Sequence, residues 1–218
     1  MRHDLHVDPD LDRLARHGAM YIAAAARDAV AARGVFTMAL SGGRNPWTMF
    51  RDLTACDMPW EHTRIFQVDE RVAPSGDDDR NLTHLLDSLA GVDADVAAMP
   101  VQDEDLEAAA ARYEQRLPTR FDLVHLGLGP DGHTASLVSN DPVLEVTDHL
   151  VALTAPYQGR RRMTLTYPAL ARTNQLLWLI TGEETHRALT SLLAGDETIP
   201  AGRVRAPSSL VLTDLAVD

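Results

Sequence analysis

Short apolar runs alternate with amphipathic stretches along this chain, and this alternation restricts the fold more than any other feature. Helical patterns separate most of the runs, and the first, over residues 10–33, is expected to end near Gly34. Apolar strands with helices between them are typical of a mainly parallel sheet covered on both faces. We predict this α/β fold, with strands in the runs 35–41, 64–68, 122–128, 149–153, 175–180 and 210–212, and with further helices notably at 103–117 and 183–194.

The length and composition favour one globular domain over residues 1–218. The chain is 45% apolar and 24% charged, which is unlike a disordered or fibrous protein. Cys56 is the single cysteine, so an internal disulfide is excluded and a reducing compartment is favoured. Neither a long apolar span nor the apolar run of a signal peptide is seen, and we therefore expect a cytoplasmic protein.

The charge balance excludes several classes of partner. The chain has 20 basic and 32 acidic residues, a net charge of −12, and all of the basic residues are arginines. Nucleic acids and anionic membranes require an electropositive face, so neither is expected as a partner. Without lysine, no side chain of this protein can form a Schiff base. An anionic ligand would have to be held by arginine and backbone N–H groups, although the arginine bias is also compatible with codon usage or a solvated acidic surface.

The residues that follow each predicted strand are the natural place for a site, because ligands of parallel sheets bind outside the carboxyl ends of the strands. The first such segment is Ser41, Gly42, Gly43 and Arg44, followed by Asn45 as a candidate N-cap and Pro46. Glycines at a helix N-terminus can bring backbone N–H groups close to a phosphate. The segment is not a Walker A loop, and an ordinary strand-to-helix turn is the alternative.

The second segment contains Asp69 and Arg71, within VDER at 68–71. Asp69 could hold a sugar hydroxyl or orient a base, and Arg71 could bind a phosphate or an oxyanion; a structural ion pair is the alternative. The three aspartates at 77–79 are typical of a solvated turn rather than a metal site.

The third segment, residues 127–136, places Asp131 and His133 in a glycine-rich turn. Its spacing matches the dinucleotide pattern G-x-G-x-x-G, but Pro130 removes a donor and Asp131 would repel a pyrophosphate, so that interpretation is rejected. A histidine oriented by a neighbouring carboxylate is a natural general base. A fourth segment, Arg160 to Arg162, is a candidate anion-attracting patch, with a surface loop or subunit contact as the alternative.

Together these segments resemble the 6-phosphogluconolactonase family, which is related by fold to the glucosamine-6-phosphate deaminases. The resemblance runs from about residue 35 to the end of the chain. Its most specific part is GLGPDGHTASL at 127–137, and the other parts are SGGRNP at 41–46, VDER at 68–71, RN at 80–81, RRMTLTYPAL at 161–170, TGEE at 181–184 and IPAGRV at 199–204.

The resemblance implies a Rossmann-like α/β/α sandwich that hydrolyses 6-phosphogluconolactone in the oxidative pentose phosphate pathway, with no metal or organic cofactor. By position, His133 would remove a proton from the attacking water, with Asp69 and Asp131 beside it. Arg71 would bind substrate or the developing oxyanion. The phosphate would be held by Ser41, Gly42, Gly43, Arg44 and Arg162. The chemistry agrees, because a lactone is an activated acyl group and needs no covalent nucleophile.

Two departures from the family pattern concern the site. Members commonly carry a lysine shortly after the TGEE-type segment, where this chain has Thr185, His186 and Arg187. We expect either that Arg187 or His186 replaces it or that the phosphate affinity is weaker. After the DGHTASL segment the chain reads Val138-Ser139-Asn140-Asp141 where Phe-Pro-Gly is usual.

Two other functions remain as alternatives to the lactonase. A glucosamine-6-phosphate deaminase would carry a glutamate where this chain has Val138. A non-catalytic sugar-phosphate sensor would need a partner protein, because the chain has no basic helix for DNA. The expected ligand is a small phosphorylated sugar lactone, bound by a monomer or a weak homo-oligomer.

Overall fold

A parallel sheet forms the centre of the molecule. In the computed structural model, which describes residues 2–43 and 45–217, seven strands lie in the order β1-β10-β9-β6-β2-β3-β5 and every neighbouring pair is parallel. The prediction of a mainly parallel sheet is therefore confirmed. The strands are β1 Asp4–Val7, β2 Phe36–Leu40, β3 Thr63–Gln67, β5 Asp95–Ala97, β6 Phe121–Leu126, β9 Thr173–Ile180 and β10 Ser208–Thr213.

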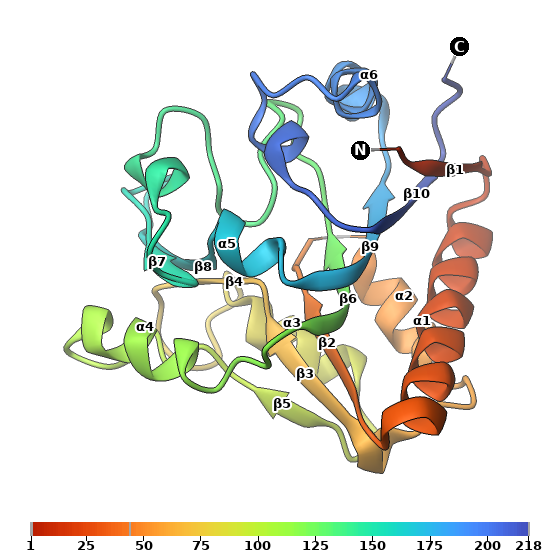
Figure 1. Cartoon of the computed structure of the whole chain (residues 1–218), viewed down its shortest axis with the longest axis horizontal. Coiled ribbons are helices and arrows are strands. Elements are labelled where there is room, and N and C mark those ends of the chain that lie inside the picture. Colours follow the sequence, from red (N-terminus) through yellow and green to blue (C-terminus); the bar gives the residue numbers. More distant parts are fainter. Residues whose placement is uncertain (1, 44, 218) are drawn as a thin grey trace.

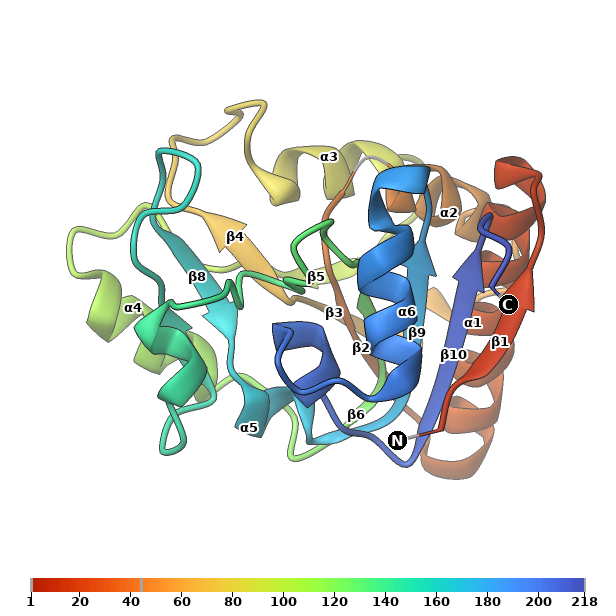
Figure 2. The same ribbon diagram turned by 90° about the horizontal axis from the view of Figure 1, so that it is seen from above.

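Helices cover both faces of this sheet and complete the three-layer sandwich (Figures 1 and 2). One face packs against α1 Leu11–Arg33, α2 Pro46–Leu53 and α3 Asn81–Ser88, and the other against α4 Leu106–Glu114, α5 Tyr167–Leu170 and α6 His186–Ala194. Successive residues of a strand point to opposite faces, so in β9 Trp178 joins one apolar core and Leu177 the other. Short 3-10 turns complete the described helices, at Trp60–His62, Pro142–Glu145, Glu183–Thr185 and Pro200–Arg203.

Local capping explains the bounds of the longest helix. The side chain of Asp10 accepts hydrogen bonds from the backbone N–H groups of Asp12 and Arg13, at 3.0 and 3.1 Å, and so begins α1. At the other end Gly34 has a φ of 79° and donates its N–H to the carbonyl of Val30. The predicted helix over 10–33 is confirmed. Among the described residues no helix is both long and apolar enough to cross a membrane.

A second, smaller sheet lies beside the first. Its described strands are β4 Asp69–Arg71, β8 Arg162–Leu165 and β7 Val151–Leu153, all paired antiparallel in the order β4-β8-β7. The run 149–153, which the alternation of strands and helices assigned to the parallel sheet, contributes β7 to this second sheet instead. The prediction was wrong because an apolar run marks a buried strand but does not identify its neighbours.

Candidate active site

A cavity of about 220 Å³ opens at the carboxyl edge of the parallel sheet. Ser41, Gly127 and Thr181 line it. They directly follow the last residues of β2, β6 and β9, respectively. Both sheets contribute to its walls. The other lining residues are Gly42, Gly43, Asn45, Pro46, Asp69, Arg71, Asn81, Leu128, Gly129, His133, Thr134, Ala135, Arg162 and Leu179.

The turn after β2 brings backbone close to a neighbouring side chain. A Cβ on Gly42 would lie 2.0 Å from Oδ1 of Asn81, so only glycine fits there. Asn45 occupies the N-cap position of α2 but makes no capping bond, and the prediction of a side-chain cap was wrong. Its amide instead donates a hydrogen bond to the hydroxyl of Thr181, which ties the turn to the end of β9. Arg44, also predicted for this site, lies outside the described residues.

The alternation of side chains along β4 decides which polar groups reach the cavity. Asp69 and Arg71 line it, while Glu70 between them is fully buried on the other side. The Glu70 carboxylate accepts hydrogen bonds from the backbone N–H groups of Asn81 and Leu82, at 2.8 and 2.9 Å, and pairs with Arg80. It therefore anchors the N-terminus of α3 and has a structural role.

Two arginines lie side by side on neighbouring strands of the small sheet. Arg71 of β4 and Arg162 of β8 are cross-strand partners, so their side chains lie on the same face, and both line the cavity. Arg162 is 5% exposed, and its Nε has no hydrogen-bond partner among the described residues. Burial, with a further contribution from the charge of Arg71, lowers the pKa of Arg162. Two adjacent cations with an unused donor form a site suited to an anion.

The glycine-rich turn after β6 holds a histidine and an aspartate together. Nδ1 of His133 lies 2.5 Å from Oδ1 of Asp131, which also accepts the backbone N–H of His133 at 3.2 Å. The turn is closed by the N–H of Gly129, which donates to the carbonyl of His133. A Cβ on Gly129 would lie 2.1 Å from the imidazole, so the glycine makes room for the ring. His133 lines the cavity, as predicted from its place in a glycine-rich turn after a strand.

The contact with His133 sets the charge of Asp131. Partial burial alone would raise the pKa of this carboxyl, but the hydrogen bonds that it accepts from His133 lower it, and the pKa lies below its ordinary value. Asp131 therefore remains an anion at neutral pH. A carboxylate on Nδ1 orients the ring and leaves Nε2 of the neutral imidazole as the atom that can accept a proton.

Asp69 lies in the same cavity but has different partners. Its Oδ2 accepts a hydrogen bond of 2.6 Å from the hydroxyl of Ser136, and its Oδ1 accepts the amide of Asn81 at 3.3 Å. Asn81 in turn accepts a hydrogen bond from the guanidinium of Arg71. Asp69 is thus connected to Arg71 through Asn81. Among the described residues, no hydrogen bond joins Asp69 to the His133 imidazole.

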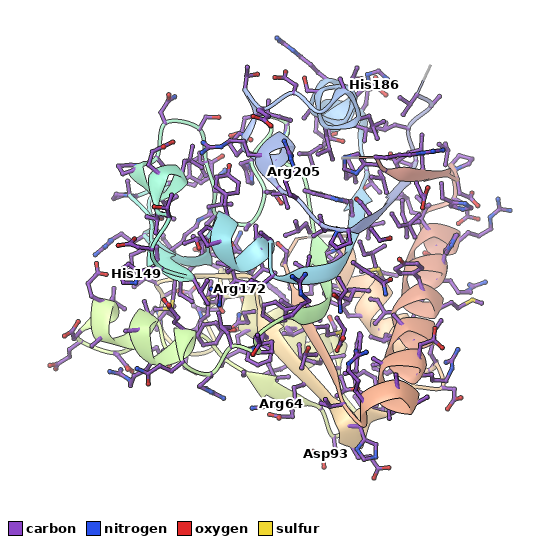
Figure 3. All side chains as sticks on the ribbon, viewed as in Figure 1. Arg64, Asp93, His149, Arg172, His186 and Arg205 are labelled. Atoms are coloured by element: carbon purple, nitrogen blue, oxygen red, sulfur yellow. The ribbon has the colours of Figure 1, made fainter. Side chains whose placement is uncertain are left out.

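The structure does not bring every predicted residue to this site. Arg187 is exposed on α6 and does not line the cavity, and His186, labelled in Figure 3, contacts the carbonyl of Ala216. The expected replacement for the family lysine is therefore not found in either residue. Arg160 and Arg161 also point elsewhere, to Asp77 and Asp79 and to Glu107, so the three consecutive arginines do not form one patch.

Three residues of the site were not selected from the sequence. Asn81 entered the sequence analysis only as part of the segment RN at 80–81. Its place beside an arginine, at the first residue of α3, is a signal that could have identified it. Thr181 follows a predicted strand and obeys the same rule as Ser41. Tyr157, which packs against His133, lies in a loop with no periodic signal.

The arrangement suits acid-base chemistry on a small anion. Within the described residues no group of three or more His, Cys, Asp or Glu side chains is placed to hold a metal ion. The cavity instead combines an oriented imidazole, two guanidinium groups and the backbone of a glycine turn. These groups can activate a water molecule and bind negative charge.

Comparison with known proteins identifies the family of this chain. A family model described as glucosamine-6-phosphate isomerases/6-phosphogluconolactonase matches residues 9–213. The chain belongs to this family. The resemblance seen in the motifs is therefore confirmed, and it extends towards the N-terminus beyond the segments that carried it.

Relatives within this family share sequence and fold over most of their length. A 6-phosphogluconolactonase of Mycobacterium tuberculosis is 34% identical over 98% of this chain and 96% of its own. One from Synechocystis sp. is 34% identical over 84% of this chain and 83% of its own. The crystal structure of 6-phosphogluconolactonase from Thermotoga maritima superimposes with a TM-score of 0.85 at 28% identity, covering 97% of this chain and 98% of that one.

Proposed function

We propose that this protein is a 6-phosphogluconolactonase, which hydrolyses 6-phospho-D-glucono-1,5-lactone to 6-phosphogluconate. The observation that carries the proposal is that the His133–Asp131 pair and the Arg71–Arg162 pair line or adjoin one cavity. The first pair can activate water and the second can bind an anion. The named relatives support this substrate.

His133 is the general base in this mechanism. Asp131 accepts the Nδ1–H of the imidazole, so Nε2 takes a proton from water as the water oxygen bonds to the lactone carbonyl carbon. The carbonyl oxygen becomes an oxyanion. When the bond to the ring oxygen breaks, the imidazolium returns its proton to that oxygen, and the products are a carboxylic acid and a free hydroxyl.

The cations and the glycine turn bind the charges of the substrate. Arg162 and the backbone of residues 41–43 hold the phosphate, while Arg71, fixed by Asn81, is placed for the substrate or the oxyanion. Arg44 belongs to the same proposal by its position in the chain. Arg71 and Arg162 are held by strands before substrate arrives, so little reorganisation is needed.

The serines in and beside the cavity favour direct attack by water. Ser136 is fully buried and donates its hydroxyl to Asp69, so it is not available as a nucleophile. Ser41 follows a strand but lacks the G-x-S-x-G elbow that activates a serine. No acyl-enzyme is therefore required.

The first experiment measures the decay of freshly generated 6-phosphogluconolactone. The purified protein is expected to accelerate decay above the spontaneous rate, and His133→Ala is expected to lower kcat by roughly 100-fold or more, the usual contribution of a general base. His149, a surface histidine labelled in Figure 3 and 66% exposed at its side chain, provides the matched control. His149→Ala should retain full activity.

The same preparations distinguish the alternatives. Equal decay rates with and without folded protein would contradict the lactonase. Release of ammonia from glucosamine 6-phosphate would indicate a deaminase instead, although Val138 offers no carboxylate for that reaction. Binding of the sugar phosphate without turnover would indicate a sensor.

The proposed activity places the protein in the oxidative pentose phosphate pathway. The reaction consumes the lactone that forms when a 6-phosphorylated aldose is oxidised at its first carbon. We further propose a cytoplasmic location, which the single, unpaired Cys56 supports.

A further inference from the structure

Tyr157 contacts members of both functional pairs of the cavity. Its ring centroid is 5.7 Å from that of His133, with the planes at 63°, and the guanidinium carbon of Arg162 is 5.0 Å from the same centroid. Its hydroxyl is 3.5 Å from Oδ2 of Asp131. One half-buried side chain therefore touches the base, the carboxylate that orients it, and an anion-binding cation.

The chemistry of the ring suits this place. The face of an aromatic ring attracts a guanidinium, and its polarised edge or face packs against a second ring in a T-shaped pair. Partial burial, together with the charge of Asp131, raises the pKa of the Tyr157 phenol, so the hydroxyl remains a donor at neutral pH. The ring thus contacts both the Arg162 cation and the imidazole, which becomes a cation itself when it accepts a proton.

The loop that carries Tyr157 is anchored on both sides. Tyr157 and Arg160 exchange backbone hydrogen bonds of 2.9 and 3.3 Å around a tight turn, in which Gln158 and Gly159 have φ values of 51° and 82°. Gln158 also accepts a hydrogen bond from Arg162 at 3.1 Å. A non-glycine residue in this backbone region is uncommon and is kept only where its surroundings hold it.

Ion pairs join this turn to a second loop. The guanidinium of Arg160 binds Asp79 at 2.7 Å and Asp77 at 3.1 Å, and Figure 2 shows the 154–161 turn beside the 72–80 loop at the edge of the small sheet. These ion pairs fix the turn that carries Tyr157 to the loop that follows β4. They also neutralise two aspartates that would otherwise repel an anionic ligand.

We propose that Tyr157 is a positioning residue, which holds the His133 imidazole and the Arg162 guanidinium at a fixed separation. It does so through its ring, and the hydroxyl contact with Asp131 is secondary because it is long. The inference rests on the proposed lactonase activity for its kinetic consequence. The geometry of the two side chains is independent of that activity.

The kinetic test compares Tyr157→Leu with Tyr157→Phe. Loss of the ring is expected to lower kcat for the phosphorylated lactone about tenfold or more and to raise KM as well, because both side chains lose their support. Phenylalanine retains the ring, and we expect it to restore kcat to within about threefold of the unmodified protein. Tyr21, a half-buried tyrosine of α1 that bonds Gln175 outside the cavity, gives the matched control: Tyr21→Leu should retain kcat and KM.

A spectroscopic test does not depend on the reaction. The Nδ1 proton of His133, assigned by its loss in His133→Ala, should give a downfield signal in the unmodified protein and in Tyr157→Phe. The signal should broaden or vanish in Tyr157→Leu. If the signal survives there and kcat is unchanged, or if phenylalanine behaves like leucine in both measurements, Tyr157 does not act through its ring. If the unmodified protein shows the signal but no lactone hydrolysis, the proposed function fails and the NMR comparison alone decides the role of Tyr157.

Discussion

The imidazole of His133 occupies a place that the backbone around it leaves free. The missing side chain at Gly129 makes room for the ring, and two residues after His133 the chain turns through Ala135, which has a φ of 52°. Positive φ at a residue with a Cβ costs about 1–3 kcal/mol and is found where the surroundings enforce it. The hydroxyl of Thr134 ties the turn to the carbonyl of Gly127. The position of the base is therefore set by backbone geometry as much as by Asp131.

The two arginines of the small sheet lead to a prediction about substrate discrimination. If Arg162 or Arg71 binds the phosphate, Arg162→Gln or Arg71→Gln should raise KM for the phosphorylated lactone by about tenfold or more, because a charge-assisted hydrogen bond is lost. KM for unphosphorylated gluconolactone should change little. Steady-state kinetics on both lactones give the comparison.

An exposed arginine offers the control for these variants. Arg187→Gln, on α6 and outside the cavity, should leave both KM values unchanged. An equal rise of KM for the two lactones in the Arg162 and Arg71 variants would argue against phosphate binding by these residues.

At the scale of helices and strands, apolar runs predicted the interior of the parallel sheet but not its edges. The buried strands β6 and β9 read as mainly apolar segments, FDLVHL and TNQLLWLI, because a strand covered on both faces needs few polar side chains. The edge strands β1 and β5 were missed, since Asp4–Val7 and Asp95–Ala97 are short and partly exposed. The strand β4 was also missed, because Asp69–Arg71 contains only charged residues, each with a specific partner.

The candidate site was predicted in part for a related reason. The rule that parallel strands end at one edge brings Ser41, Asp69 and His133 together, and the structure confirms that these three line one cavity. Contacts that depend on antiparallel register are not visible in the sequence. The pairing of Arg71 with Arg162 and the packing of Tyr157 are of this kind.

A buried histidine on β6 leads to a prediction about stability. His125 is fully buried against Phe50, and neither ring nitrogen has a hydrogen-bond partner among the described residues. Burial lowers its pKa from 6.5 to about 3. Below pH 6.5 the unfolded chain binds a proton that the folded chain excludes, so the free energy of unfolding decreases as the pH falls towards 3. Above pH 6.5 both states are neutral and the residue adds no pH dependence.

Denaturant unfolding of His125→Leu at two pH values measures this effect. Between about pH 7 and about pH 5 the unmodified protein should lose roughly 2 kcal/mol through this residue, and the variant should lack that part of the loss. His149→Leu, at an exposed position, should keep the full dependence. Identical pH dependence in the His125 variant would show that the ring becomes charged without penalty in the folded state.

At the scale of the whole molecule, an acidic protein surrounds a cationic cavity. The net charge of −12 repels anions at a distance, so binding of a phosphorylated ligand must come from the groups inside the cavity. Arg162 contributes most clearly, since it is nearly buried and is influenced mainly by the charges of Asp69 and Arg71. Occupation of this cavity should stabilise the entire fold, because both sheets contribute to it.

Thermal unfolding with the reaction product measures that stabilisation. At about 100 times its dissociation constant, 6-phosphogluconate should stabilise the folded state by about 2.7 kcal/mol and raise Tm by roughly 5–10 °C. Gluconate at the same concentration should give a clearly smaller shift, and Arg162→Gln should reduce the difference between the two. Equal shifts from both compounds would contradict a phosphate site in the cavity.

One residue between the two sheets has a consequence for the choice of ligand. Val68 donates its N–H to the carbonyl of Leu40 in β2 and accepts the N–H of Leu165 in β8, at 3.0 and 2.8 Å. The glycine turn that follows β2 and the wall that carries the two arginines are thereby joined without a hinge. The span between them acts as a gauge for the anionic group that both sides are proposed to hold, and a carboxylate, which is smaller than a phosphate, would engage one side of the cavity while missing the other.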